Sequence, residues 1–165
     1  MPVGSDGEVC VRSVGVMAGY WTDGRRDEEA TAQAVRDGWM HTGDVGHLDE
    51  DGYLYVVDRI KDLIIRGGFN VYPRDVEDVL LSHPAVTAAA VVGRPDPVLG
   101  EEVVAWVALA TDATTTAEEL VDYSRERLGR HKHPREVRIV PAVPLTSVGK
   151  TDRKALRGTA PPVPG

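Results

Sequence analysis

The stretch "DLIIRGGFNVYPRDVEDVLLSH", Asp62–His83, carries a strand pattern followed directly by a helix pattern. Its first half predicts a β-hairpin with Gly67 and Gly68 at the bend, because a backbone φ above zero costs glycine little. Pro73 then suits the first turn of a helix, and the apolar residues after it recur at helical spacing. The stretch therefore predicts a hairpin that leads straight into a helix.

The residues that follow alternate between strand and helix patterns. "VTAAAVVG" and "EEVVAWVAL" are apolar runs separated by a Pro-Asp-Pro loop, which predicts two buried strands. "TTTAEELVDYSRERLG" opens with a capping box from Thr116 to Glu119, which predicts a helix that ends at Gly129. A last strand, "VRIVPAV", and a short helix near Lys154–Arg157 complete the pattern. About a hundred residues of this kind are enough for one small α+β domain.

We expect residues 1–60 to be the incomplete, mainly β end of a larger domain. "GEVCVRS" predicts a strand, and "GWMHTGDVGHLDEDGYLYVVDR" predicts two strands joined at an Asp-Glu-Asp-Gly turn. Between them, "RRDEEATAQAVRDG" has helical spacing through Val35, with Gly38 placed to end the helix. This part has too few large apolar residues to make a good core alone. The chain is therefore divided into residues 1–60, a small domain at 61–158 and a disordered tail at 159–165.

The composition is that of a globular protein, without a sign of export or membrane insertion. Of 165 residues, 42% are hydrophobic and 27% are charged. No run approaches the ~20 apolar residues of a membrane span, and the N-terminus lacks the basic start and apolar run of a secretion signal. Cys10 is the one cysteine, which agrees with a reducing compartment, so we expect a cytoplasmic protein.

The net charge of −7 argues against a general nucleic-acid binder, but the charge is uneven along the chain. Residues 121–165 hold ten Lys and Arg against four Asp and Glu, whereas the first 120 residues hold nine against twenty-two. A basic end on an acidic protein suits a compact polyanion such as a nucleotide. A solvated helix face would give the same pattern, so both interpretations stay open.

The Gly-Lys-Thr at positions 149–151 resembles the end of a phosphate-binding Walker loop, but the comparison fails. That loop needs a glycine five residues before the Gly-Lys pair, where this chain has Pro144. Proline has a fixed φ and no N–H to offer to a phosphate. Lys150 therefore needs another explanation.

Four separate segments match one family, and they match in the right order. "GEVCVRSVGVMAGYW" is similar to a Gly-Glu and Gly-Tyr segment, "GWMHTGDVG" to a Thr-Gly-Asp segment, "YLYVVDRIKDLIIRGGFNVYPRDVE" to a hinge and hairpin, and "PLTSVGKTDRKALR" to a closing Pro-x-Thr-x-x-Gly-Lys-x-x-Arg motif. From about Gly7 to Gly158 the chain thus resembles the C-terminal third of the adenylate-forming enzymes, the superfamily of acyl-CoA synthetases, peptide-synthetase adenylation domains and luciferases. The resemblance implies the small C-terminal domain of that superfamily, preceded by the end of the large AMP-binding domain.

Within the superfamily, "DRIKDLIIRGGFNVYP" looks most like the fatty acyl-CoA synthetases. This likeness implies an acid–thiol ligase that activates a carboxylic acid with ATP to an acyl-AMP and transfers the acyl group to coenzyme A. A medium- or long-chain fatty acid would be the substrate, and ATP with Mg²⁺ and coenzyme A would be the co-substrates. Aryl-CoA ligases remain an alternative, because the family's acyl pocket lies upstream of the matched segments.

The resemblance also assigns roles at the nucleotide. Lys150 matches the lysine that bridges the acyl oxygen and the α-phosphate during adenylation, as a compact cation on a long stem can. Asp44 matches the aspartate that holds the ribose hydroxyls, and Arg59 resembles the arginine that contacts the nucleotide. Without the motifs, Asp44 would be a turn aspartate, Lys150 a solvated loop lysine and Arg59 a surface partner of Asp58, which replaces the family's common glycine.

Three further residues match positions that serve the thioester step. Lys61 sits where the family has its hinge residue, about which the small domain rotates between the adenylation and thioester-forming poses. Gly67 and Gly68 resemble the hairpin glycines that line the pantetheine tunnel, although a plain β-turn demands them equally. In "RHKHPREV", His131 replaces the family's usual tyrosine. No carboxylate or cysteine lies at ligand spacing from these histidines, so we expect a surface loop and no metal site.

The family's phosphate loop, adenine pocket and acyl pocket lie upstream of the segments matched here. We therefore expect these 165 residues alone to have little or no ligase activity, with an N-terminal adenylation domain as the partner. Two alternatives are a non-catalytic module that binds coenzyme A or AMP and an interaction module that complements a separate large domain. A homodimer through unpaired strands of residues 1–60 is a third.

Overall fold

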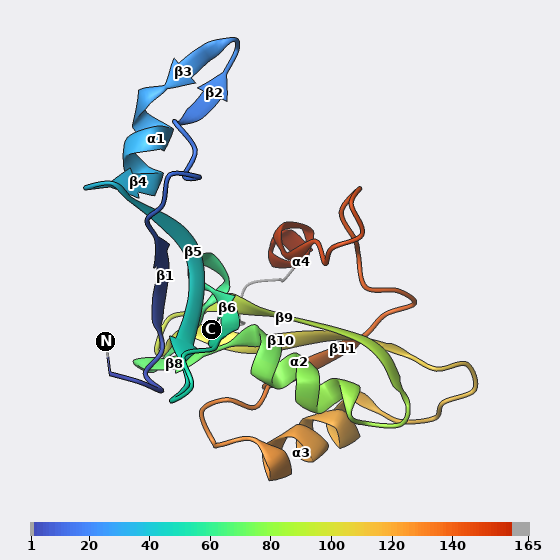
Figure 1. Ribbon diagram of the computed structural model, residues 1–165. Helices are drawn as coiled ribbons and strands as arrows, with labels where there is room; N and C mark the ends of the chain where they lie inside the picture. Colours follow the sequence, from blue (N-terminus) through green and yellow to red (C-terminus); the bar gives the residue numbers. More distant parts are fainter. Residues whose placement is uncertain (1, 160–165) are drawn as a thin grey trace. The chain divides into compact units, whose positions relative to one another are not determined.

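A computed structural model describes residues 2–159, which divide into two compact units, one up to Lys61 and one from Asp62 onward (Figure 1). Strands and short helices occur in both units, which confirms the α+β class. None of the helices within residues 2–159 is long and apolar enough to cross a bilayer. The predicted disordered tail begins at Thr159, the last residue of α4 (Arg153–Thr159), and its remaining residues lie outside the described part of the chain.

One long strand organises the unit up to Lys61. This strand is β5 (Trp39–Leu48), and its antiparallel partners are β1 (Gly7–Val11), β4 (Val35–Arg36) and β6 (Leu54–Arg59). Among the described residues of this unit, Val45 is the one buried apolar side chain. The sheet therefore has almost no core of its own.

The helix in this unit is shorter than the sequence indicates. α1 (Glu28–Ala34) is capped at its N-terminus by Asp27, whose Oδ1 accepts from the Ala30 N–H at 2.9 Å. Before it, β3 (Arg25–Asp27) pairs with β2 (Tyr20–Thr22), and after it Val35 already belongs to β4. The predicted helix end near Gly38 is wrong, because pairing with β5 satisfies the backbone groups that a longer helix would have bonded.

The unit from Asp62 onward has a five-stranded sheet with β10 at its centre. β10 runs antiparallel to β9 and parallel to β11, and the β7–β8 hairpin joins it at Gly100. The elements of this unit, after the short 3-10 turn η1 (Ile60–Asp62) at its start, are β7 (Ile64–Arg66), β8 (Phe69–Val71), α2 (Pro73–Leu81), β9 (Val86–Asp96), β10 (Gly100–Leu109), α3 (Ala117–Arg127), β11 (Glu136–Ile139) and α4.

Both faces of this sheet are packed, because successive residues of β10 point to opposite sides. Ala105 belongs to a core shared with α2 and α3, which contribute Leu80 and Leu120. Trp106 belongs to a second core, to which α4 contributes Leu156. The two helices α2 and α3 therefore cover one face and α4 covers the other, as Figure 1 shows.

The predicted hairpin and the predicted capping box are confirmed. Gly67 and Gly68 have φ values of +57° and +82°, and two positive values are what a type I′ turn requires. The Thr116 hydroxyl accepts from the Glu119 N–H at 3.2 Å, while the Glu119 carboxylate accepts from the Thr116 N–H at 2.9 Å. α3 ends before the predicted Gly129, since the next residue after the helix is already extended.

Candidate functional site

Asp44 and Arg59 face each other across neighbouring strands. They are register partners on β5 and β6, and the Arg59 Nε donates to Asp44 Oδ1 at 2.8 Å. The Asp44 side chain is 30% exposed and the Arg59 side chain is 54% exposed, so the pair lies at the surface. The structure thus brings together two predicted residues that stand fifteen positions apart in sequence.

A kink in β5 presents Asp44. Gly43 has φ +71°, a conformation that residues with a Cβ rarely adopt. The Thr42 hydroxyl donates to the Val9 carbonyl at 2.8 Å and accepts from the Asp44 N–H at 3.1 Å. The register between β1 and β5 shifts at this point, as in a β-bulge, which re-aims the side chain that follows. The Thr-Gly pair therefore sets the position of the carboxylate.

Arg59 and Lys61 line one cavity of about 470 Å³ in the unit up to Lys61. Arg36 and Glu8 line the same cavity. Three cationic side chains against one carboxylate give the cavity a positive balance, which suits an anionic ligand. Asp44 is not part of this lining, but its partner Arg59 is.

Glu8 is a site residue that the sequence analysis did not single out. Its Oε1 accepts from the Gly43 N–H at 3.2 Å, and its Oε2 lies 2.7 Å from His41 Nδ1. The hydrogen bond with His41 lowers the pKa of the Glu8 carboxyl from its ordinary value of 4.5; burial opposes this and the Gly43 N–H adds to it. Glu8 stands in the Gly-Glu motif, but the motif alone does not reveal that this carboxylate supports the kink before Asp44.

Lys150 lies in a tight loop. The Thr146 N–H donates to the Lys150 carbonyl at 2.7 Å, and the Gly149 N–H donates to the Thr146 carbonyl at 2.9 Å. Gly149 has φ +79°, which a glycine adopts without strain. The Pro144 carbonyl accepts from the Asp152 N–H at 2.9 Å and closes the loop. Lys150 is exposed at the end of this ordered segment.

An ion pair fixes the chain just after this loop. Arg153, the first residue of α4, donates through Nη2 to both carboxylate oxygens of Glu77 on α2, at 2.7 and 2.9 Å. Glu77 Oε1 also accepts from the Val91 N–H on β9 at 2.8 Å. The Arg153 and Glu77 side chains are 22% and 14% exposed. α2, β9 and α4 are therefore joined at the base of the Lys150 loop.

Contacts of the preceding residue, Arg66, stabilise the hairpin turn of Gly67 and Gly68. Arg66, which is 5% exposed, lies 2.7 Å from the Glu102 carboxylate and donates to the His131 carbonyl at 3.0 Å. A Cβ at Gly68 would meet nothing within 4 Å, so the turn presents an open surface there. The sequence analysis missed Arg66 and Glu102, because no motif links residues so far apart.

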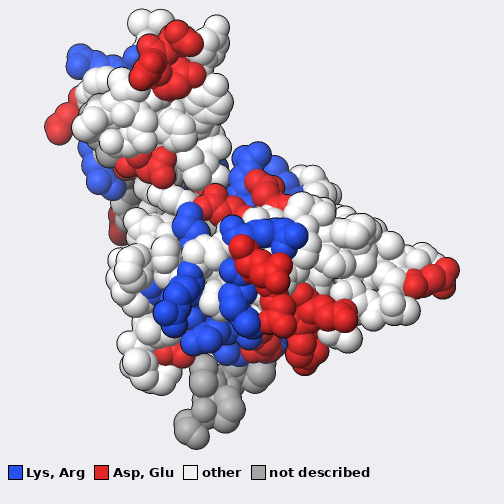
Figure 2. Space-filling view, turned by 90° about the horizontal axis from the view of Figure 1, so that it is seen from below, with Lys and Arg blue, Asp and Glu red and all other residues white. Residues whose placement is uncertain are grey.

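Several basic side chains near the end of the chain are paired with acidic ones. Lys132 Nζ lies 2.8 Å from Asp75, and Arg125 forms an ion pair with Asp122. Figure 2 shows Lys and Arg side chains gathered beside a group of Asp and Glu side chains. The excess of positive charge in residues 121–165 is therefore not a uniformly positive surface.

Residues 75–150 match the family of AMP-binding enzyme C-terminal domains. Residues 75–150 are thus the part of this chain that is an AMP-binding enzyme C-terminal domain. The matched range begins within α2 and ends at Lys150, so it includes β9, β10, α3 and β11 and the loop up to Lys150. The match confirms the resemblance drawn from the four motifs.

Relatives of known name are similar to this chain over almost its whole length. A medium/long-chain fatty-acid–CoA ligase of Mycobacterium tuberculosis is 44% identical in an alignment of 161 positions that covers 93% of this chain and 28% of the ligase. A feruloyl-CoA synthase of an Amycolatopsis species is 47% identical over 150 residues, which are 91% of this chain and 30% of the synthase. Among solved structures, ATP-bound MatB from Rhodopseudomonas palustris matches with a TM-score of 0.89 at 36% identity, over 96% of this chain and 31% of MatB.

The chain therefore spans less than a third of the length of the relatives that it matches. The names of the two ligases differ in the acyl group, since one mentions a fatty acid and the other a feruloyl group. This chain is similar to both at nearly the same identity, 44% and 47%. Similarity over this part of the chain thus does not identify an acyl substrate.

Proposed function

We propose that this chain provides the lid and the ribose-side edge of an acid–thiol ligase. Such an enzyme joins a carboxylate to the α-phosphate of ATP with release of pyrophosphate, and then transfers the acyl group to the thiol of coenzyme A with release of AMP. In this proposal, residues 1–60 end a large adenylation domain and residues 61–158 form the lid. The observation that carries it is the exposed, ordered Lys150 loop within an AMP-binding enzyme C-terminal domain.

Lys150 is the proposed catalytic residue. Adenylation brings two anions into contact, so a cation that bridges the acyl oxygen and the α-phosphate stabilises the charge of the transition state. The loop supports this role because its backbone is hydrogen-bonded from Pro144 to Asp152 while Lys150 remains exposed.

Asp44 and Arg59 are the proposed nucleotide ligands. A carboxylate can accept from both ribose hydroxyls, and Asp44 keeps one oxygen beyond the Oδ1 that accepts from Arg59. Arg59 also lines the positively balanced cavity, where an anionic part of the nucleotide would be favoured.

Lys61, Gly67 and Gly68 are proposed to serve the second half-reaction. Lys61 lies within the turn of η1, and the two compact units meet at this residue along the chain, which supports a hinge there. The open surface at Gly68 supports a close approach by a thin ligand such as pantetheine. The type I′ turn alone would also require both glycines. Substitution of either glycine would therefore disturb the turn and the proposed pantetheine tunnel at the same time.

The proposed acyl substrate is a medium- or long-chain fatty acid. Likeness around the hinge and the similarity to a fatty-acid–CoA ligase support it, and the similarity to a feruloyl-CoA synthase supports an aryl acid as the second candidate. Product analysis of an enzyme that contains this chain, with both acids in competition, decides between the two.

The proposed partner is a large adenylation domain. Residues 53–56 of β6 and its preceding turn are apolar and exposed, with relative accessibilities of 68%, 50%, 53% and 49% for Tyr53, Leu54, Tyr55 and Val56. Such a patch on a strand is typical of a protein interface. We therefore expect the 165 residues alone to release no pyrophosphate from ATP and a fatty acid, and measurable release would contradict the proposal.

Lys150→Ala tests the catalytic role in an enzyme that joins this chain to an adenylation domain. We expect adenylation to fall by roughly 10²–10³-fold, because one charge-stabilising group is lost, while thioester formation from preformed acyl-AMP stays within a few-fold. Pyrophosphate release and acyl-CoA formation measure the two steps separately. Lys154→Ala, an exposed lysine of α4, is the matched control. Equal loss in both steps would exclude the role.

A binding or interaction module is the alternative function. Calorimetry of the isolated chain with AMP and with coenzyme A tests the binding module. Mixing the chain with a separately produced adenylation domain tests complementation, and a sizing column tests a homodimer. Recovery of ligase activity on mixing would favour the interaction module over a nucleotide-binding one.

A further inference from the structure

Glu8, Cys10 and His41 form a compact cluster in the unit up to Lys61. One potential ligand atom from each residue lies within 4.8 Å of the other two. Cys10 Sγ is 3.5 Å from His41 Nδ1, and Glu8 Oε2 is 2.7 Å from the same nitrogen. Among residues 2–159, this is the one group of three or more His, Cys, Asp and Glu side chains that meets this distance.

The strand geometry explains why the three side chains meet. Cys10 and His41 are register partners on β1 and β5. Glu8 stands two positions before Cys10, and residues two apart on a strand point to the same face. The shift in register between Glu8 and Cys10, at the kink of Gly43, then lets the Glu8 carboxylate reach His41. The cluster is therefore held by the backbone of two paired strands.

The donor set fits a divalent cation of intermediate softness. Thiolate, imidazole and carboxylate are the three ligand types that Zn²⁺ takes in proteins. A tetrahedral Zn²⁺ with bonds of about 2.3 Å to sulfur and about 2.0 Å to nitrogen holds those two atoms roughly 3.5 Å apart. Cys10 Sγ and His41 Nδ1 already have this separation of 3.5 Å. A thiolate and a carboxylate would also balance the charge of the cation.

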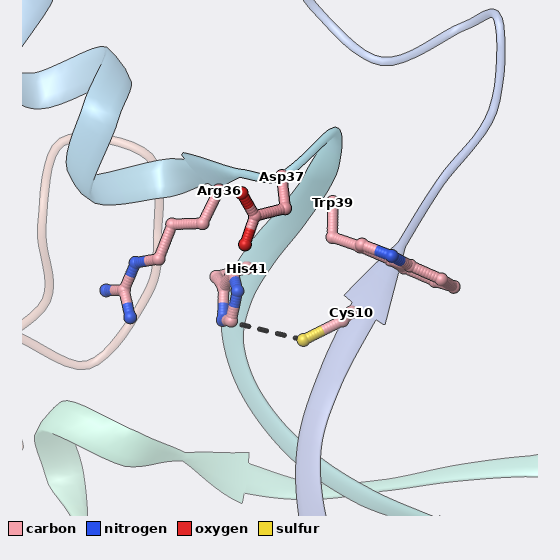
Figure 3. A pocket seen from close by; sticks show the side chains of 5 residues that line it. All are labelled: Cys10, Arg36, Asp37, Trp39 and His41. Carbon is pink, nitrogen blue, oxygen red and sulfur yellow. Dashed lines mark hydrogen bonds between the residues drawn. The ribbon is translucent and has the colours of Figure 1, made fainter.

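An open side of the cluster leaves room for a fourth ligand. A cavity of about 430 Å³ is lined by Cys10, His41, Asp37, Arg36 and Trp39 (Figure 3). Asp37 lines this cavity but is not part of the three-residue group, so a water molecule from the cavity can supply the fourth ligand. Arg36 opposes cation binding, so the affinity depends chiefly on the three clustered ligands.

We infer that Glu8, Cys10 and His41 bind Zn²⁺ through one carboxylate oxygen, the thiolate sulfur and Nδ1. On binding, the cation takes the place of the proton on His41 Nδ1, the neutral imidazole then carries its proton on Nε2, and the thiol releases its proton to solvent. Oε2 and Nδ1 then separate from 2.7 Å to about 3.3 Å, which a carboxylate rotation supplies. Glu8 also lines the cavity of Arg59 and accepts from the Gly43 N–H through Oε1, so the zinc site adjoins the proposed nucleotide site, and Oε2 is the oxygen assigned to the cation.

The same unit contains a matched pair without sulfur. His47 Nδ1 lies 3.0 Å from Asp6 Oδ1, and the His47 side chain is 32% exposed against 24% for His41. This pair has the same histidine and carboxylate chemistry on β5 but no cysteine beside it. His47→Gln is therefore the control for His41→Gln.

Titration of the 165-residue chain with Co²⁺ tests the site, with Co²⁺ as the spectroscopic substitute for Zn²⁺. We expect a thiolate-to-Co²⁺ charge-transfer band that saturates at one equivalent and is removed by added Zn²⁺. Cys10→Ser abolishes the band, and His41→Gln weakens Zn²⁺ binding by more than ~100-fold, since even a residue behind a metal ligand is worth 10–100-fold. His47→Gln retains the band and the affinity.

Protection of Cys10 from alkylation supplies a test on the unaltered chain. Because the sequence has one cysteine, the rate of thiol alkylation reports on this position alone. Zn²⁺ should slow the reaction by at least about tenfold and Mg²⁺, which prefers oxygen ligands, should leave it unchanged. Absence of a Cys10-dependent band, or equal alkylation with and without Zn²⁺, overturns the inference. Equal loss of affinity in His47→Gln and His41→Gln overturns it as well.

Discussion

The two units of this chain differ most in what holds them together. From Asp62 onward, β10 is packed on both faces, with Ala105 on one side and Trp106 on the other. Up to Lys61, Val45 is the one buried apolar side chain among the described residues. The first unit therefore depends chiefly on strand hydrogen bonds and leaves apolar side chains exposed, whereas the second has a core that can stabilise it alone.

The ion pairs of the two units follow the same division. Arg66 and Glu102 are 6% and 8% exposed, and Arg59 and Asp44 are 54% and 30% exposed. A buried pair is expensive to break, because one charge is left without a partner away from water. A surface pair costs little to break, since water replaces the lost partner. The two ion pairs have similar distances of 2.7 and 2.8 Å, but we expect very different free-energy costs for breaking them.

The largest expected effect comes from breaking the buried pair. Arg66→Met should lower the free energy of unfolding of the second unit by about 3–5 kcal/mol, because the buried Glu102 carboxylate loses its nearest cation. The carboxylate keeps the Val103 N–H at 2.9 Å and the exposed Arg135 at 3.5 Å. Arg59→Met should cost the first unit no more than about 1 kcal/mol. Denaturant titration followed by hydrogen exchange of β10 and β5 amides measures both. Equal costs would refute the division between the units.

The next largest loss of stability should come from creating a cavity in the core of the second unit. Leu80→Ala removes a fully buried side chain of α2 and should destabilise the second unit by about 2–5 kcal/mol. Leu81→Ala, on the next residue, removes a side chain that is 45% exposed and should change the stability by no more than about 0.5 kcal/mol. Thermal unfolding of both variants provides the measurement, and a similar loss in both would mean that α2 is packed differently.

The smallest expected effect is a dependence on pH in the second unit. Burial, with Arg66, Arg135 and Arg125 nearby, lowers the pKa of His133 from its ordinary value of 6.5. Below pH 6.5, His133 therefore binds a proton more readily in the unfolded chain than in the folded one. The stability that neutral His133 contributes is fully present above that pH and is lost as the pH falls toward the folded pKa.

His133→Gln should flatten this decline between about pH 7 and pH 5. Urea titrations of the original chain and the variant across this range compare the two slopes. His133 is 6% exposed, and its Nδ1 has no hydrogen-bond partner within residues 2–159. The substitution by glutamine therefore removes no hydrogen bond made by Nδ1. Identical slopes would show that another group causes the dependence.

Elements specified by residues close in sequence were predictable. The turn at Gly67 and Gly68, the helix that starts at Pro73 and the capping box all act over a few positions, and each is present in the structure. The short helix α1 was predicted too long, because the residues at its two ends pair in local hairpins with the neighbouring strands β2 and β5. Helical spacing cannot reveal such competition.

Local sequence patterns also predicted only part of the candidate site. Motifs singled out Asp44, Arg59 and Lys150, and the structure adds how the first two meet across β5 and β6. Glu8 escaped notice, because its contacts with Gly43 and His41 span more than thirty residues. Contacts between strands depend on register, which no local pattern fixed here.

The Glu77 carboxylate, finally, limits how far Lys150 can reach. By binding Arg153 and the Val91 N–H together, it anchors the chain three residues beyond the lysine, and the Pro144 to Asp152 hydrogen bond narrows the loop before that anchor. With the backbone tethered in this way, the radius swept by the ammonium equals the span of the lysine side chain itself. In the proposed function, the distance at which Lys150 meets the phosphate is then set by the length of its side chain, and α2 is the fixed support of the loop.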